Sequence, residues 1–168
     1  MGMKALSHLA RWHLSAAEGW LGLGNFHEAR AELKQISSAF RSHPDVLELR
    51  FLMNAVLKRW DTALNVARTL TRQAPARLTG WVATANALHG LNQTKRAWDT
   101  LVSVSDRFPE NSTVPYNLAC YSAQFGRLDE AWEWLHKAME SAGDVKLIKE
   151  RALADSDLQA LWDRVREL

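Results

Sequence analysis

The sequence predicts an all-α fold built from a repeated helix–turn–helix unit. Two observations support this prediction. Residue types recur at a fixed interval along the chain, and apolar residues inside each interval follow helical spacing. A fixed period of this kind is typical of repeat architectures, in which each unit buries its apolar face against its neighbours. The period is clearest in four evenly spaced alanines: Ala29, Ala63, Ala97 and Ala131.

Columns beside the alanines keep the same period. Three residues before the alanines stand Phe26, Trp60, Thr94 and Leu128. Four residues after them stand Leu33, Ala67, Leu101 and Leu135. Several aligned columns of apolar or turn-forming residues make chance an implausible explanation of the period.

Each interval contains two predicted helices. In the second half of the first interval, Ala29, Leu33 and Ile36 fall at i, i+4 and i+7, which places them on one helix face. In the first half of the third interval, Trp81 and Ala85 also show helical spacing. We expect turns at 24–26, 58–60, 92–94 and 126–128. We expect repeats over 10–43, 44–77, 78–111 and 112–145, stacked as a right-handed α-solenoid in one domain, 1–168.

The segment 146–168 lacks the repeated columns and is predicted to be a C-terminal cap. Ser156 and Gln159 have the spacing of a capping box, which predicts a helix from near Asp157. One face of that helix would be apolar and cover the last repeat, as a terminal cap requires. That face comprises Leu158, Leu161, Trp162 and Val165.

These residues resemble the tetratricopeptide repeat (TPR) family, whose 34-residue unit has small residues at positions 8 and 20 and proline at position 32. Position 8 is occupied here by Ala17, Phe51, Ala85 and Ala119. The stretch 116–140 is the most typical copy. Phe51 departs from the pattern, and Ala67 is expected to make room for it. The first repeat has its proline late, at Pro44, so its second helix is expected to run longer.

Composition excludes several classes of protein. Apolar residues make up 47% and charged residues 24%, which is typical of a folded chain, and a net charge of +2 does not favour nucleic acid. The single cysteine, Cys120, cannot form an intrachain disulfide, which suits a reducing compartment and a cytoplasmic location. No apolar run is long enough to span a membrane. Catalytic motifs are absent and the six histidines are scattered, so we expect no enzyme, metal or cofactor.

The resemblance implies a non-catalytic module that binds a peptide or partner protein along the inner surface of its first helices. Carried over by position, that surface has an acidic N-terminal half, with Asp45 and Glu48, and also includes Arg11, Ser15 and Glu18. Its C-terminal half is the predicted site, in which Asn86 and Asn117 would face each other and pair with an extended peptide backbone. The predicted site residues are Asn86, His89, Tyr116, Asn117, Cys120, Gln124 and Arg151.

Two alternatives remain open at this stage. One is a structural, scaffold or chaperone-like protein that associates with copies of itself through an exposed end or a tryptophan-bearing face. The other is an enzyme that uses Cys120 as a nucleophile with His89 or His136. Among the eight tryptophans, Trp20, Trp60 and Trp81 fall on predicted core positions. Trp98, Trp132 and Trp134 are expected to pack between hairpins.

Overall fold

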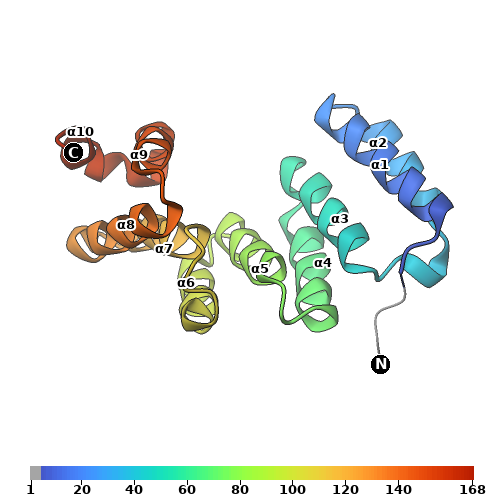
Figure 1. Ribbon diagram of the computed structural model, residues 1–168, viewed down its shortest axis with the longest axis horizontal. Helices are drawn as coiled ribbons and strands as arrows, with labels where there is room; N and C mark the ends of the chain where they lie inside the picture. Colours follow the sequence, from blue (N-terminus) through green and yellow to red (C-terminus); the bar gives the residue numbers. More distant parts are fainter. Residues whose placement is uncertain (1–4) are drawn as a thin grey trace. The chain divides into compact units, whose positions relative to one another are not determined.

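The computed structural model describes residues 5–168, which contain α-helices and short 3₁₀ helices and no strand (Figure 1). The chain divides into two compact units, Met1–Leu91 and Asn92–Leu168. The all-α prediction is confirmed, while a single domain over 1–168 stays a prediction.

From residue 5 onward, the first unit contains five α-helices, which pack in antiparallel neighbouring pairs. Within it α1 packs against α2, α3 against α4, and α4 against α5. Figure 1 shows the two members of each of the first two hairpins running side by side. The elements are α1 (His8–Gly22), α2 (Phe26–Gln35), η1 (Ser38–Phe40), α3 (Pro44–Val56), α4 (Trp60–Gln73) and α5 (Leu78–Gly90).

The second unit begins with α6 and ends in the cap. Helix α7 packs against α8, α6 and η3, and α9 packs against α8 and α10. The elements are α6 (Thr94–Val102), η2 (Ser105–Arg107), α7 (Thr113–Gln124), α8 (Leu128–Ala142), α9 (Val145–Ala154), η3 (Ser156–Leu161) and α10 (Trp162–Arg166).

The sequence period is present in the backbone as well. The second helix of every repeat begins one full period after the previous one, at Phe26, Trp60, Thr94 and Leu128. Two residues earlier the chain adopts positive φ, which lets one helix stop and the next start at a sharp angle. The φ values are 72° at Gly24, 52° at Lys58, 59° at Asn92 and 73° at Gly126.

All four repeated alanines are buried, and the helix pairs α1–α2, α3–α4 and α7–α8 of their repeats pack together. A methyl group at this position lets the two helices of a hairpin approach closely. Phe51 and Ala67 are also both buried, and the expectation that Ala67 makes room for Phe51 stays a prediction.

Two predicted boundaries are wrong. Helix α2 ends at Gln35 instead of running longer, because Ile36 adopts extended backbone and Ser37 then caps the short helix η1. In the cap, Asp155 rather than Ser156 accepts the backbone N–H that starts η3, so the chain forms a 3₁₀ helix before α10. The apolar face is nevertheless as predicted, with Leu158, Leu161 and Val165 buried.

The tryptophans divide into packed and exposed groups. Trp60 and Trp81 are half-buried, and the Trp60 indole covers the backbone of Gly90, where any Cβ would overlap the ring. Trp98 packs inside the second unit and donates from Nε1 to Ser122 Oγ at 3.3 Å. The core prediction for Trp20 is wrong, because this side chain lies at the surface. Among residues 5–168, no helix has the length and apolar character needed to cross a membrane.

Candidate interaction sites

Three of the predicted site residues are buried on α7: Tyr116 is 1% exposed, Cys120 4% and Asn117 9%. The C-terminal cap contacts Tyr116 and Cys120, and its helix η3 packs against α7. As a binding site these residues stay a prediction, and a ligand would reach them only if the cap moved.

Asp155 connects the cap to α7. Its Oδ2 accepts a hydrogen bond from Tyr116 Oη at 2.9 Å and from Cys120 Sγ at 3.6 Å, and its Oδ1 accepts from the backbone N–H of Asp157 at 3.1 Å. The Arg151 guanidinium carbon lies 3.7 Å from the centroid of the Tyr116 ring, and Gln124 Nε2 donates to Asp157 Oδ1 at 3.2 Å. Four of the predicted site residues are therefore brought together by contacts with the cap.

Sequence reasoning missed Asp155. The available signal was an aspartate just before the helix predicted from near Asp157, a position that favours a cap. That signal identifies a helix start. It does not indicate that the other carboxylate oxygen of Asp155 accepts a hydrogen bond from the distant hydroxyl of Tyr116.

The environment of Cys120 opposes a nucleophilic role. Burial, and then the nearby charges of Asp155 and Asp157, raise the pKa of the thiol above its usual range. A reactive cysteine needs the opposite shift, because the thiolate is the nucleophile. His136 Nδ1 lies 3.1 Å from the carbonyl oxygen of Trp132, within its own helix.

The remaining two predicted site residues belong to the first unit. Asn86 and His89 lie on α5, both half-buried, and each already takes part in an interaction. Asn117 belongs to the second unit. The facing pair of asparagines therefore stays a prediction.

A cavity of about 470 Å³ opens in the first unit on the inner face of α1 and α3, and we call it the groove cavity. Four of its residues occupy positions that the TPR resemblance assigns to the inner surface: Arg11, Ser15, Glu18 and Asp45. The complete lining is Ala5, Leu6, Arg11, Leu14, Ser15, Glu18, His43, Asp45 and Arg77.

Charges at the edge of the groove cavity are partly paired. Arg77 Nη1 lies 2.6 Å from Asp45 Oδ1 and 3.3 Å from Glu48 Oε1, and the hydrogen bond to Asp45 is the main reason why its pKa is raised. Glu18 and Arg11 form no ion pair with any residue among 5–168. The same part of the chain holds no cluster of histidine, cysteine and carboxylate side chains that could bind a metal ion.

Comparison with solved structures identifies the fold. MamA residues 41–end from Desulfovibrio magneticus RS-1 is 19% identical, with 98% of this chain and 97% of that one covered at a TM-score of 0.71. A thermophilic TPR protein from Thermus thermophilus is 16% identical, with 95% and 100% covered at 0.66. The chain has the tetratricopeptide-repeat fold.

Another similar structure is PilF of Pseudomonas aeruginosa, at 19% identity, with 95% of this chain and 70% of that one covered and a TM-score of 0.75. No protein-family model and no curated protein sequence matches the chain. At these identities the likeness defines the TPR fold alone, and the function has to be argued from the chain's own surfaces.

Proposed function

We propose that this TPR chain is a non-catalytic interaction module that holds a peptide or a segment of a partner protein against the inner face of α1 and α3. The groove cavity is the observation that carries the proposal, since it opens at the positions that the repeat pattern assigns to ligand contact. A cytoplasmic location is part of the proposal, because a single buried thiol suits a reducing compartment. Gln124 and Arg151 keep exposed atoms, and with Asn86 and His89 they stay proposed contacts beyond the cavity.

Two charged side chains of the groove cavity, Glu18 and Arg11, are unpaired within residues 5–168, so a ligand that carries a basic and an acidic side chain suits it. Arg77 is already held by two carboxylates, and Thr79 Oγ1 donates to Glu48 at 2.6 Å, so these groups form a closed network. Glu18 stands outside that network with its carboxylate available. A lysine or arginine of the ligand could pair with Glu18 while its backbone follows the apolar wall at Leu14.

Selection of peptides from a random display library on the intact chain tests this proposal. Enriched peptides should carry lysine or arginine, and Glu18→Lys should weaken their binding about tenfold, because a rim charge contributes on the order of 1 kcal/mol and its reversal adds repulsion. Glu140→Lys, at an exposed position of α8, is the matched control and should bind as the parent does. Failure to enrich any peptide, or equal binding by the parent chain and Glu18→Lys, would refute the proposal that the groove cavity binds peptides.

Self-association is a second candidate function, supported by the outer face of α1. Large apolar side chains stand exposed in one stripe: Leu9 (63%), Trp12 (57%), Trp20 (37%) and Leu23 (77%). Ala16 and Gly19 lie between them and help to line a shallow cavity of about 410 Å³. Together the four large side chains expose about 400–500 Å² per copy, the size of patch that often marks an interaction site.

The stripe has the symmetry that a two-fold dimer requires. Leu9 and Leu23 each lie seven residues from Ala16, and Trp12 and Trp20 each lie four residues from it. In an antiparallel pair of α1 helices with its two-fold axis at Ala16, the two Ala16 methyl groups would face each other. Trp12 of each copy would then face Trp20 of the other copy. Two such stripes would bury about 1,000 Å², which is near the lower limit for a specific interface.

Cysteine cross-linking tests the dimer. On mild oxidation Ala16→Cys should form a disulfide-linked dimer, because the axis brings the two copies of residue 16 together. Ser15→Cys, one residue away on the polar face of α1, should stay monomeric. Sedimentation of the Trp12→Glu, Trp20→Glu double variant should show monomer at concentrations where the parent dimerises. A parent chain that is monomeric at every concentration excludes this candidate.

A further inference from the structure

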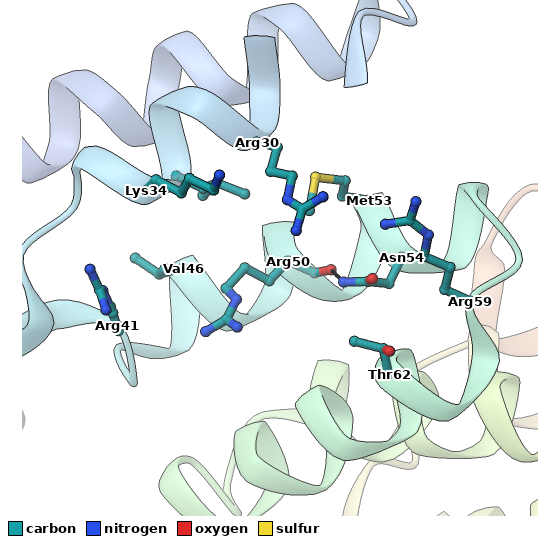
Figure 2. Close-up of a pocket in the computed structure, with 10 residues that line it drawn as sticks. Arg30, Lys34, Arg41, Val46, Arg50, Met53, Asn54, Arg59 and Thr62 are labelled. Carbon is teal, nitrogen blue, oxygen red and sulfur yellow. Dashed lines mark hydrogen bonds between the residues drawn. The ribbon is translucent and has the colours of Figure 1, made fainter. Parts of the chain in front are cut away.

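A second cavity of the first unit, of about 400 Å³, is lined by basic side chains (Figure 2), and we call it the basic pocket. Figure 2 shows Arg30 extending from α2 and Arg59 extending from the turn before α4, with Met53 nearby. Among residues 5–168, no acidic side chain lines the basic pocket. Its basic members are Arg30, Lys34, Arg41, Arg50 and Arg59. The other lining residues are Leu33, Val46, Met53, Asn54 and Thr62.

Most of these cations have no counter-charge. Arg30, Lys34, Arg50 and Arg59 form no ion pair with any carboxylate in the described part of the chain, and Arg41 Nε donates to the carbonyl oxygen of Ile36 at 3.3 Å. The whole chain carries a net charge of only +2, so positive charge is concentrated here. Cations around one cavity repel each other, and a bound anion removes that repulsion.

The basic pocket also departs from the repeat pattern. The residue equivalent to Arg30 is Leu64 in the second repeat and Trp98 in the third. Leu64 is buried on α4, which packs along α5, and Trp98 bonds to Ser122 within the second unit. Arg30 is instead exposed, and α2 meets α3 at few positions. The first repeat thus has a cation and a cavity at a repeat position where the second and third repeats have large apolar side chains.

The lining suits a small phosphorylated molecule. The volume lies within the range of small-ligand sites, and most of the lining side chains are charged or polar. Guanidinium groups bind phosphate through two parallel hydrogen bonds. Asn54 donates from Nδ2 to the carbonyl oxygen of Arg50 at 2.7 Å, which leaves its Oδ1 to accept from a ligand, while Leu33 and Met53 offer apolar contact.

We propose that the basic pocket binds a small organic phosphate that carries two or more phosphate groups. Several unpaired cations around one concavity match a compact ligand with two to four negative charges. An acidic segment of a partner protein would distribute its charge over a longer surface. The basic pocket shares no lining residue with the groove cavity, so this proposal is independent of the proposed peptide binding.

Calorimetric titration of the intact chain at fixed ionic strength tests the site, with inorganic pyrophosphate and ADP as probes. Both should bind with a dissociation constant below about 1 mM, and inorganic sulfate should bind at least tenfold more weakly. Tighter binding of ADP than of pyrophosphate would assign the apolar lining to the organic part of the ligand, whereas equal binding would assign recognition to the phosphates alone. Both results support the proposal.

Substitutions then locate the binding. Arg30→Leu and Arg50→Gln should each weaken pyrophosphate binding at least tenfold. Arg68→Leu is the matched control, since Arg68 is an exposed arginine of α4 outside the pocket, and it should change the affinity less than twofold. Three results would overturn the proposal: neither probe binds more tightly than sulfate; Arg68→Leu loses as much affinity as Arg30→Leu; or a decaglutamate peptide binds in an Arg30-dependent way while the phosphates do not. Circular dichroism of each variant confirms that it is folded.

Discussion

The contact between Asp155 and Tyr116 should hold the C-terminal cap on α7, and its geometry and burial set the size of its contribution to stability. Tyr116 is almost fully buried, and its hydroxyl donates to a charged acceptor at 2.9 Å. Hydrogen bonds to charged groups contribute about 1.5–3 kcal/mol. Tyr116→Phe should therefore lower the free energy of unfolding by about 1–2 kcal/mol, because half-buried Asp155 regains some hydration. Asp155→Ala should cost about 2–4 kcal/mol, since it also removes the bond to the Asp157 backbone.

A double-mutant cycle isolates this contact. Urea unfolding followed by circular dichroism should give a coupling free energy of about 1–2 kcal/mol between Tyr116→Phe and Asp155→Ala. Asp144→Ala, which removes the cap of α9 at the Leu147 backbone N–H and touches neither residue, should add to Tyr116→Phe without coupling. Asp155→Ala should also speed the labelling of Cys120 by a thiol reagent. Additive effects of Tyr116→Phe and Asp155→Ala on the free energy of unfolding, or an unchanged rate of Cys120 labelling, would show that Asp155 does not hold the cap on α7.

Three further predictions concern stability. Lys58→Gly should raise the free energy of unfolding by about 0.5–1 kcal/mol and Asn92→Gly by less, because asparagine tolerates positive φ better than lysine does; denaturant midpoints check the order, and a destabilised Lys58→Gly would contradict it. Arg30→Leu should stabilise the parent chain by about 1 kcal/mol, because the equivalent residue of the second repeat, Leu64, is buried. A lower melting temperature of the variant would contradict the idea that an apolar side chain suits this position better than arginine. Stability should fall above about pH 8.5, because the buried Cys120 thiol keeps its proton in the folded state while the unfolded thiol loses it. That loss has a slope of up to about 1.4 kcal/mol per pH unit, and Cys120→Ala should reduce the slope between about pH 8.5 and 10; an identical slope in the variant would exclude the thiol as its source.

The periodic part of the fold could be predicted from the sequence because it depends on local rules. The second-helix starts follow from residues such as Phe26 and Trp60, whose spacing is visible without any structure. The 3₁₀ helix after α2 could not be predicted, because Ile36 continues the apolar pattern while its backbone leaves the helix.

The site was predicted less well, for a reason that lies in tertiary contacts. Tyr116 and Cys120 both contact Asp155 of the cap, and the repeat pattern did not indicate that Asp155 would cover them. Trp20 matched a core position, but its side chain lies in the exposed apolar stripe of α1 with Trp12 and Leu23, which the repeat spacing did not indicate. The basic pocket depends on Arg30 and Arg59, which the whole of α3 separates in the sequence, so only the folded chain brings them together.

The positive-φ residues at 24, 58, 92 and 126 have a consequence for lengthening the chain. Each marks the same point in the repeat, so an inserted segment preserves the helix phase only if it has the length of one whole repeat. One residue more or fewer would rotate the following helix by about 100° and turn its alanine away from its partner helix. A duplicated copy of residues 59–92, inserted directly after Asn92, should therefore fold as an additional hairpin. A copy shortened by one residue within a helix should leave that hairpin unpacked and open to protease.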